Sequence, residues 1–150
     1  MLARLQLKLA RVGVLSALAL AAIGPEAPSA NAAGITIASL WGSWQATLLW
    51  SGGGCGPSSG LLNFTFGLNG TTSTATLVGH SAGCGNSSTT QTFTVQSLRP
   101  NGSGTANLSC GRACGWQLII QVDPTATIFN LVDVDPANPG NFVEGTAIKQ

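Results

Sequence analysis

Hydrophobic and polar residues alternate along short runs of this chain, and turn residues separate the runs. A period of two is typical of a β-strand with one buried face, and from Leu40 onward no stretch of useful length has helical spacing. The pattern predicts eight strands, at 40–50, 61–68, 71–79, 90–98, 104–110, 116–122, 127–134 and 142–149. Because the connections are short, we expect an all-β fold, an eight-stranded antiparallel up-and-down barrel, with a two-sheet β-sandwich as the alternative.

The segment around Asn69-Gly70 also predicts the register of one hairpin. Asn-Gly is the preferred pair for a two-residue type I′ turn, which would set Leu68 opposite Thr71 and Phe64 opposite Ala75. Large residues then mostly face small ones on the inner side, while threonines and an asparagine line the outer side. The register and the polarity therefore agree with a closed interior.

Several large apolar residues are expected to point into that interior from different strands. If space remains between their side chains, they would bind a small apolar or aromatic molecule. If they fill the interior, we expect the loops at the rim of the barrel to carry the function. These candidate ligand-binding residues are Trp50, Phe64, Phe66, Phe93, Trp116, Leu118 and Phe129.

The first residues have a different character from the strand region. Basic residues precede an apolar run at 12–23, which is too short to cross a bilayer as a helix, and Ala30-Asn31-Ala32 has the small-x-small pattern of a cleavage site. An amphipathic surface helix is the alternative. We predict a signal peptide at 1–32, cleaved near Ala32, and a single β-barrel domain at 33–150 that is secreted or periplasmic.

The predicted mature chain carries little charge. Three basic side chains stand against four acidic ones, a net charge of −1. Such a surface has no basic patch to bind nucleic acid through counterion release or to bind anionic membranes. The strands also lack the length and aromatic girdles of a transmembrane barrel. We therefore expect no nucleic-acid partner and no membrane insertion of the mature chain.

Four cysteines fall in or beside odd-numbered connections, which an up-and-down meander brings to one end of the barrel. In an exported chain they predict two disulfides, with Cys55–Cys84 and Cys110–Cys114 favoured among three pairings. A zinc site formed by the four thiolates, or by three thiolates with His80, is the alternative. The C-x-x-x-C spacing argues against a redox site.

The other ionisable residues give little indication of catalysis. His80 is expected to point outward near the rim. Asp133 and Asp135 share a strand face, but Asp135 precedes a proline, so we expect these residues to form a turn. A weak Ca²⁺ site that includes Asn138, or an acid–base pair, is the alternative. We predict that the protein is not an enzyme and has no cofactor.

Gly42-Ser43-Trp44 in the first strand and Lys149 in the last, together with the strand count, resemble the calycin pattern of lipocalins and avidins. In those families a G-x-W near the start of the first strand lies below a basic side chain from the last strand. The resemblance implies structural roles for Gly42, Trp44 and Lys149. The chain departs from the pattern in two ways: the families' usual basic residue is arginine, and the long helix that lipocalins carry before the last strand is missing.

These observations favour a secreted, non-catalytic binding protein that takes a small apolar or aromatic ligand in the barrel or at its disulfide-pinned rim. The resemblance implies one alternative, a calycin-like protease inhibitor acting through residues 33–39 and the rim loops, with an extracellular protein as its partner. A structural or adhesive surface module is the third hypothesis, because Thr, Ser and Asn dominate the expected exterior.

Overall fold

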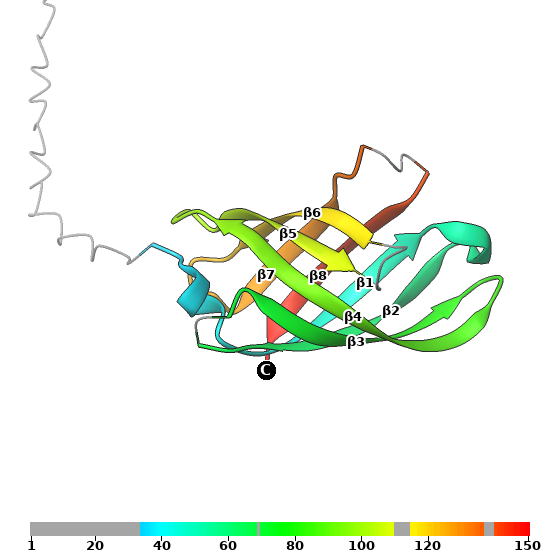
Figure 1. Ribbon diagram of the computed structural model, residues 1–150, viewed down its shortest axis with the longest axis horizontal. Helices are drawn as coiled ribbons and strands as arrows, with labels where there is room; N and C mark the ends of the chain where they lie inside the picture. The colour runs from blue at the N-terminus through cyan, green and yellow to red at the C-terminus, as the bar shows by residue number, and fades with distance from the viewer. Residues whose placement is uncertain (1–33, 69, 110–114, 137–139) are drawn as a thin grey trace, which may run out of the picture. The chain divides into compact units, whose positions relative to one another are not determined.

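The computed structural model describes residues 34–68, 70–109, 115–136 and 140–150. Eight strands form a closed antiparallel barrel in which each strand pairs with its sequence neighbours and β1 pairs with β8 (Figure 1). The strands are β1 (Gly42–Ser51), β2 (Ser58–Phe66), β3 (Thr72–Ser81), β4 (Gly85–Leu98), β5 (Ser103–Ser109), β6 (Gly115–Val122), β7 (Ile128–Asp133) and β8 (Phe142–Lys149). The predicted barrel is confirmed and the sandwich is not.

In the part of the chain that the structure describes, two short 3₁₀ helices accompany the strands. The helix η1 (Ile37–Leu40) precedes β1, and η2 (Gly53–Cys55) lies in the connection from β1 to β2. Across the described ranges, no helix has the length and apolar character needed to cross a membrane.

The hairpin register predicted from Asn69-Gly70 is confirmed along β2 and β3, where Phe64 lies opposite Ala75. Asn69 itself lies outside the described residues. Near the turn the arrangement differs from the prediction: Gly70 N donates to Gly67 O at 3.1 Å, and Leu68 is 61% exposed. Leu68 therefore points to solvent and does not extend the inward-facing row.

The strand β4 is longer than the sequence pattern predicted and begins at Gly85 instead of residue 90. Residues 85–94 of this strand pair with β3, from Gly85 opposite Ser81 through to Thr94 opposite Thr72. On the outer wall this register sets threonine against threonine in successive pairs, as at Thr76 and Thr90. The long β3–β4 hairpin extends one end of the barrel wall.

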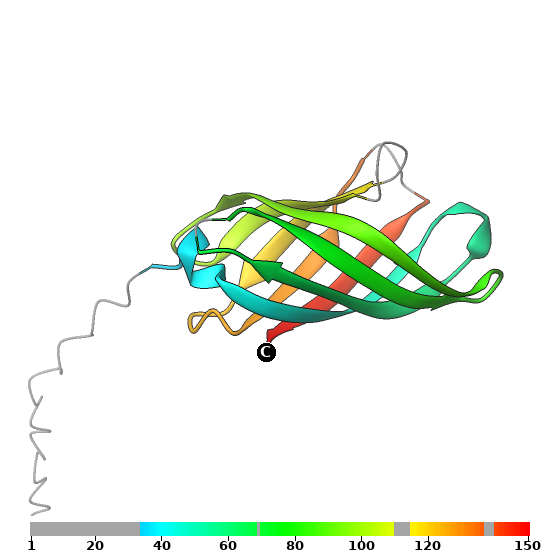
Figure 2. The same ribbon diagram turned by 60° about the horizontal axis from the view of Figure 1, so that its bottom comes forward.

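The meander gives the barrel two different ends (Figures 1 and 2). The β1–β2, β3–β4 and β7–β8 connections lie at one end, which we call the mouth. The β2–β3, β4–β5 and β6–β7 connections lie at the other end, together with η1 and the last residues of β8. We call this second end the closed end.

Aromatic side chains fill the half of the interior next to the closed end. Ring centroids lie 4.9 Å apart for Trp44 and Phe129, 5.0 Å for Phe64 and Phe93, and 5.8 Å for Phe66 and Phe93. Each of these rings is at most 4% exposed. Burying a side chain of this size contributes about 1.5–3 kcal/mol, so this cluster is a main source of stability.

Candidate functional site

At the closed end, the first and last strands are held together by Trp44 and Lys149. The Trp44 Nε1 donates to the Leu40 carbonyl at 2.7 Å, and the Lys149 Nζ donates to the Ser39 carbonyl at 3.2 Å. The same Nζ lies 5.6 Å from the Trp44 ring centroid. This packing matches the structural role that the calycin resemblance implied.

Gly42 completes this arrangement. It has a φ of +121°, and a Cβ added there would lie 3.0 Å from Lys149 Cε. A glycine is therefore suited both to the backbone conformation and to the close approach of the lysine stem.

The mouth carries the disulfide. Cys55 in the β1–β2 connection is bonded to Cys84 in the β3–β4 connection. Two backbone hydrogen bonds also join these connections, Gly83 N to Cys55 O at 2.9 Å and Ala82 N to Pro57 O at 3.0 Å. The predicted Cys55–Cys84 pairing is confirmed, and such a bond is typical of an oxidising compartment.

The predictions for the other two cysteines and for a zinc site have different outcomes. Cys110 and Cys114 lie outside the described residues. The proposed four-thiolate zinc site is wrong, because Cys55 and Cys84 are bonded to each other. Elsewhere in the described ranges, no three His, Cys, Asp or Glu side chains come together as a metal site.

Two tryptophans face inward near the mouth. Trp50 is the next-to-last residue of β1 and Trp116 is the second residue of β6, and both are half-buried against the core. Thr89 of β4 shares the inward-facing parity of Gln91 and Phe93 but is exposed. The inner wall therefore becomes accessible to solvent at this end of the barrel.

A pair of glycines provides the surface on which Trp50 lies. Gly60 of β2 and Gly79 of β3 are directly opposite each other in the register. Added Cβ atoms there would lie 3.1 Å and 2.3 Å from Trp50 Cη2. The Trp50 indole thus occupies space that any larger residue on either strand would need.

A layer of buried leucines lies below the mouth. On five strands, the inward-facing residue two positions further from the mouth is a leucine that is at most 5% exposed. The residues from which these positions are counted are Trp50, Gly60, Gly79, Trp116 and Asp133. We define the leucine layer as these five residues: Leu48, Leu62, Leu77, Leu118 and Leu131.

On β4 the residue two positions deeper than Thr89 is Gln91, not leucine. Its side chain is 4% exposed, and its Nε2 donates to Thr89 Oγ1 at 3.0 Å. Its Oε1 is buried and accepts no hydrogen bond from any described residue. A buried amide oxygen without a partner costs free energy, so this atom is unusual for a barrel interior.

The candidate ligand-binding residues thus fall into two groups. The buried group, whose side chains are at most 4% exposed, packs together inside the barrel: Phe64, Phe66, Phe93, Leu118 and Phe129. Trp50 and Trp116 form the second group, because they touch this core and still present part of their surface at the mouth. The sequence patterns missed Gly60, Gly79 and Gln91.

The predicted polar sites are engaged in local contacts. His80 is exposed on the outer wall, as predicted, with Nδ1 2.9 Å from Asn86 Oδ1. Asp133 Oδ1 accepts from Asp135 N at 2.8 Å, which is the predicted turn. Asn138, the third residue of the alternative Ca²⁺ site, lies outside the described residues.

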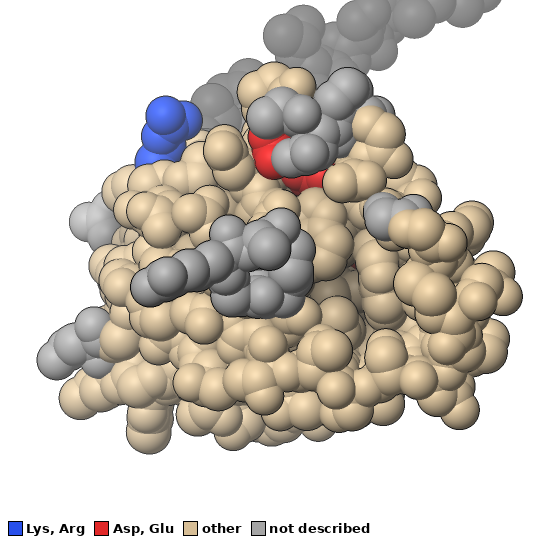
Figure 3. All heavy atoms as spheres, turned by 45° about the vertical axis from the view of Figure 1, so that its right-hand side comes forward, with Lys and Arg blue, Asp and Glu red and all other residues tan. Residues whose placement is uncertain are grey.

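Among the described residues, acidic side chains lie at both ends of the barrel, with Asp123 at the closed end and Asp133 at the mouth. In the described part of the chain the basic residues are Arg99 and Lys149, and both belong to the closed end. Asp133, at the mouth end of β7, shares the inward-facing parity of Leu131 and is half-buried. Figure 3 shows acidic atoms near the mouth and a basic side chain at the edge of the view, on a described surface that is otherwise uncharged.

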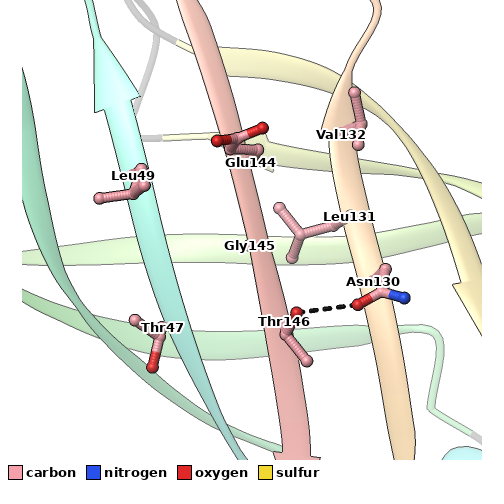
Figure 4. Close-up of a pocket in the computed structure, with 8 residues that line it drawn as sticks. All are labelled: Thr47, Leu49, Asn130, Leu131, Val132, Glu144, Gly145 and Thr146. Atoms are coloured by element: carbon pink, nitrogen blue, oxygen red, sulfur yellow. Dashed lines mark hydrogen bonds between the residues drawn. The ribbon is translucent and has the colours of Figure 1, made fainter.

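A hollow lies on the outer wall, across β1, β8 and β7. It has a volume of 410 Å³, and Glu144 lies in it between Leu49 and Val132 (Figure 4). Thr146 Oγ1 donates to Asn130 Oδ1 at 2.8 Å along its edge. This groove is shallow and none of the predicted ligand-binding residues lines it.

The closed eight-stranded meander and the packing of Trp44 under Lys149 are consistent with a calycin-like fold. No protein-family model matches the chain, and no curated protein is detectably similar to it.

Proposed function

We propose that this protein is an extracellular, non-catalytic binding protein of the calycin type that takes a small aromatic molecule at the barrel mouth. The observation that carries the proposal is the pair Trp50 and Trp116, two half-buried indoles that face inward above the leucine layer. Indole faces stack favourably on flat aromatic ligands, and the leucine layer provides an apolar base for them. The disulfide keeps two of the surrounding connections in place.

Two features support binding over the other hypotheses. The described ionisable groups are used locally, as with His80 and Asn86, so they favour a binding role over a catalytic one. The N-terminal segment packs at the closed end, where Ile35 is 7% exposed and its N donates to Pro100 O at 2.9 Å. A protease inhibitor that used this segment together with the mouth would need contacts at opposite ends of the barrel.

Isothermal titration calorimetry with benzothiophene tests the proposal. We expect saturable binding with one site per chain. Trp50→Leu and Trp116→Leu should each weaken it by about tenfold, since each removes an aromatic contact worth on the order of 1 kcal/mol or more. Native mass spectrometry of protein purified from its own source should also show a retained small molecule.

Trp41→Leu is the matched control, because Trp41 is 57% exposed and follows η1 at the closed end. This variant should bind benzothiophene as the wild type does. Equal weakening by Trp41→Leu, or no saturable binding at all, would remove the support for a ligand site at the mouth.

A further inference from the structure

We infer that the ligand of the mouth carries a hydrogen-bond donor, an N–H or O–H group on its aromatic ring, and that Gln91 Oε1 accepts from it. This inference rests on the proposed function and adds the chemical class of the ligand. It begins from Gln91, whose buried Oε1 is without a hydrogen bond from the described residues.

The Gln91 amide lies on the side of the core that faces the proposed ligand site at the mouth. Gln91 lies on the inward-facing row of β4, between exposed Thr89 and fully buried Phe93. Because its Nε2 donates to Thr89 Oγ1, the amide group is turned toward the mouth and away from Phe93. The amide therefore lies at the boundary between the filled core and the accessible inner wall.

The neighbours of the amide show why its oxygen needs a partner. In the register, Gln91 faces Ala75, and Leu77 of the leucine layer faces Thr89. An apolar side chain at this position would need no hydrogen-bond partner. An amide there leaves an acceptor unsatisfied, at about 1–3 kcal/mol, until a donor arrives.

The chemistry of the mouth favours a donor over an acceptor. Asp133, the half-buried carboxylate on the inward-facing row of β7, can only accept hydrogen bonds when it is ionised. The basic residues of the described ranges, Arg99 and Lys149, lie at the other end. An aromatic molecule with an N–H group could donate to this carboxylate as well as to Gln91 Oε1.

A rotation of the Gln91 amide by 180° would exchange its two polar atoms. The oxygen would then meet the Thr89 hydroxyl, and the NH₂ group would lack an acceptor. The ligand would in that case need an acceptor, and the experiment below separates the two cases.

The test compares three bicyclic probes of similar shape by calorimetry: indole, which has an N–H donor, benzothiophene, which has none, and isoquinoline, which has only an acceptor. We expect indole to bind about fivefold to tenfold more tightly than benzothiophene, the usual gain from one hydrogen bond. In Gln91→Leu, indole and benzothiophene should bind about equally, because the acceptor is gone.

A stability measurement on the same variant is independent of any ligand. Gln91→Leu removes the unpaired oxygen and completes the leucine layer, so its Tm should rise by about 3–6 °C. Gln45→Leu is the control, because Gln45 lies on the outer wall and its Nε2 donates to Asn63 Oδ1 at 2.9 Å. It should keep the wild-type preference for indole and show no rise in Tm.

The outcomes separate this inference from the proposed function. If no probe binds the wild type, both the proposed function and this inference are wrong. If indole and benzothiophene bind equally, or isoquinoline binds best, the mouth is a ligand site but the donor inference is wrong. A lower Tm in Gln91→Leu would also overturn it, because the amide would then be satisfied in the free protein.

Discussion

The ammonium group of Lys149 lies 5.6 Å from the centre of the Trp44 indole and donates to the Ser39 carbonyl, so the last strand is fastened to both β1 and η1. This contact closes the barrel where its first and last strands meet. A cation over an indole contributes about 0.5–2 kcal/mol, depending on how far it is removed from water.

Lys149→Met should therefore destabilise the protein. Methionine keeps an apolar side chain over Trp44 but removes the charge and the donor, and we expect the free energy of unfolding to fall by about 1–2 kcal/mol. Urea denaturation measures this change. Lys149→Arg is the control and should keep most of the stability. Equal losses in the two variants would mean that shape, not charge, is what matters at this position.

Gly79→Ala should displace Trp50. The added Cβ would lie 2.3 Å from Trp50 Cη2 and 3.0 Å from the Ser59 carbonyl oxygen, so the indole must rotate. We expect a loss of about 1–3 kcal/mol in stability, a shift in tryptophan fluorescence and weaker benzothiophene binding.

Gly67→Ala is the matched control for this change. Gly67 has no atom within 4 Å of an added Cβ and follows β2 at the closed end. Its fluorescence and benzothiophene binding should equal those of the wild type. Unchanged binding in Gly79→Ala would show that the orientation of Trp50 does not matter to the ligand.

The free energy of unfolding should depend on pH through the carboxylate of Asp123. The Thr125 hydroxyl, together with backbone N–H donors of Ile128, Thr127 and Thr125, holds the pKa of Asp123 well below its ordinary value, against a smaller opposing effect of desolvation. Because the folded-state pKa is lowered, this stabilisation is present above about pH 4 and is lost as the pH falls toward the folded-state pKa.

Asp123→Asn provides the comparison. At pH 7 the variant should unfold at a lower urea concentration than the wild type, and the difference should shrink steadily below about pH 4. A constant difference across this range would show that the charge of Asp123 contributes nothing.

Replacing both cysteines of the disulfide should weaken the fold. The bond spans 29 residues in sequence, and in the chain-entropy account a loop of this size stabilises by about 3–4 kcal/mol. The Cys55→Ser/Cys84→Ser variant should show this loss in urea denaturation. Adding a reductant to the wild type should cost at least as much stability, since a reductant would also open the predicted Cys110–Cys114 bond. A loss below about 1 kcal/mol would mean that the two connections hold together without it.

The register of the β2–β3 hairpin could be predicted because turn chemistry and alternation agree around Phe64 and Ala75. Extending that register by four residues also brings Gly60 opposite Gly79, so the sequence contained the glycine pair. It gave no indication that an indole from β1 would lie there, since that contact depends on how the barrel closes.

The first half of β4 could not be recognised by alternation. Ser87 and Thr89 point inward but remain exposed, so polar residues occupy both faces and the period of two disappears. Alternation does not mark Gln91 as inward-facing for a related reason, because its neighbours Thr90 and Thr92 are also polar. Its shared parity with Phe93 and Val95 was the available signal that this amide points inward.

The carboxy-terminal residue has a practical consequence. Gln150 N donates to Ser43 O at 2.9 Å, which fixes the last residue of the chain beside the start of β1. A linker fused after Gln150 would thus leave the barrel at its closed end, opposite Trp50 and Trp116. Molecules immobilised on a sensor through such a linker would all present their openings to the flowing analyte.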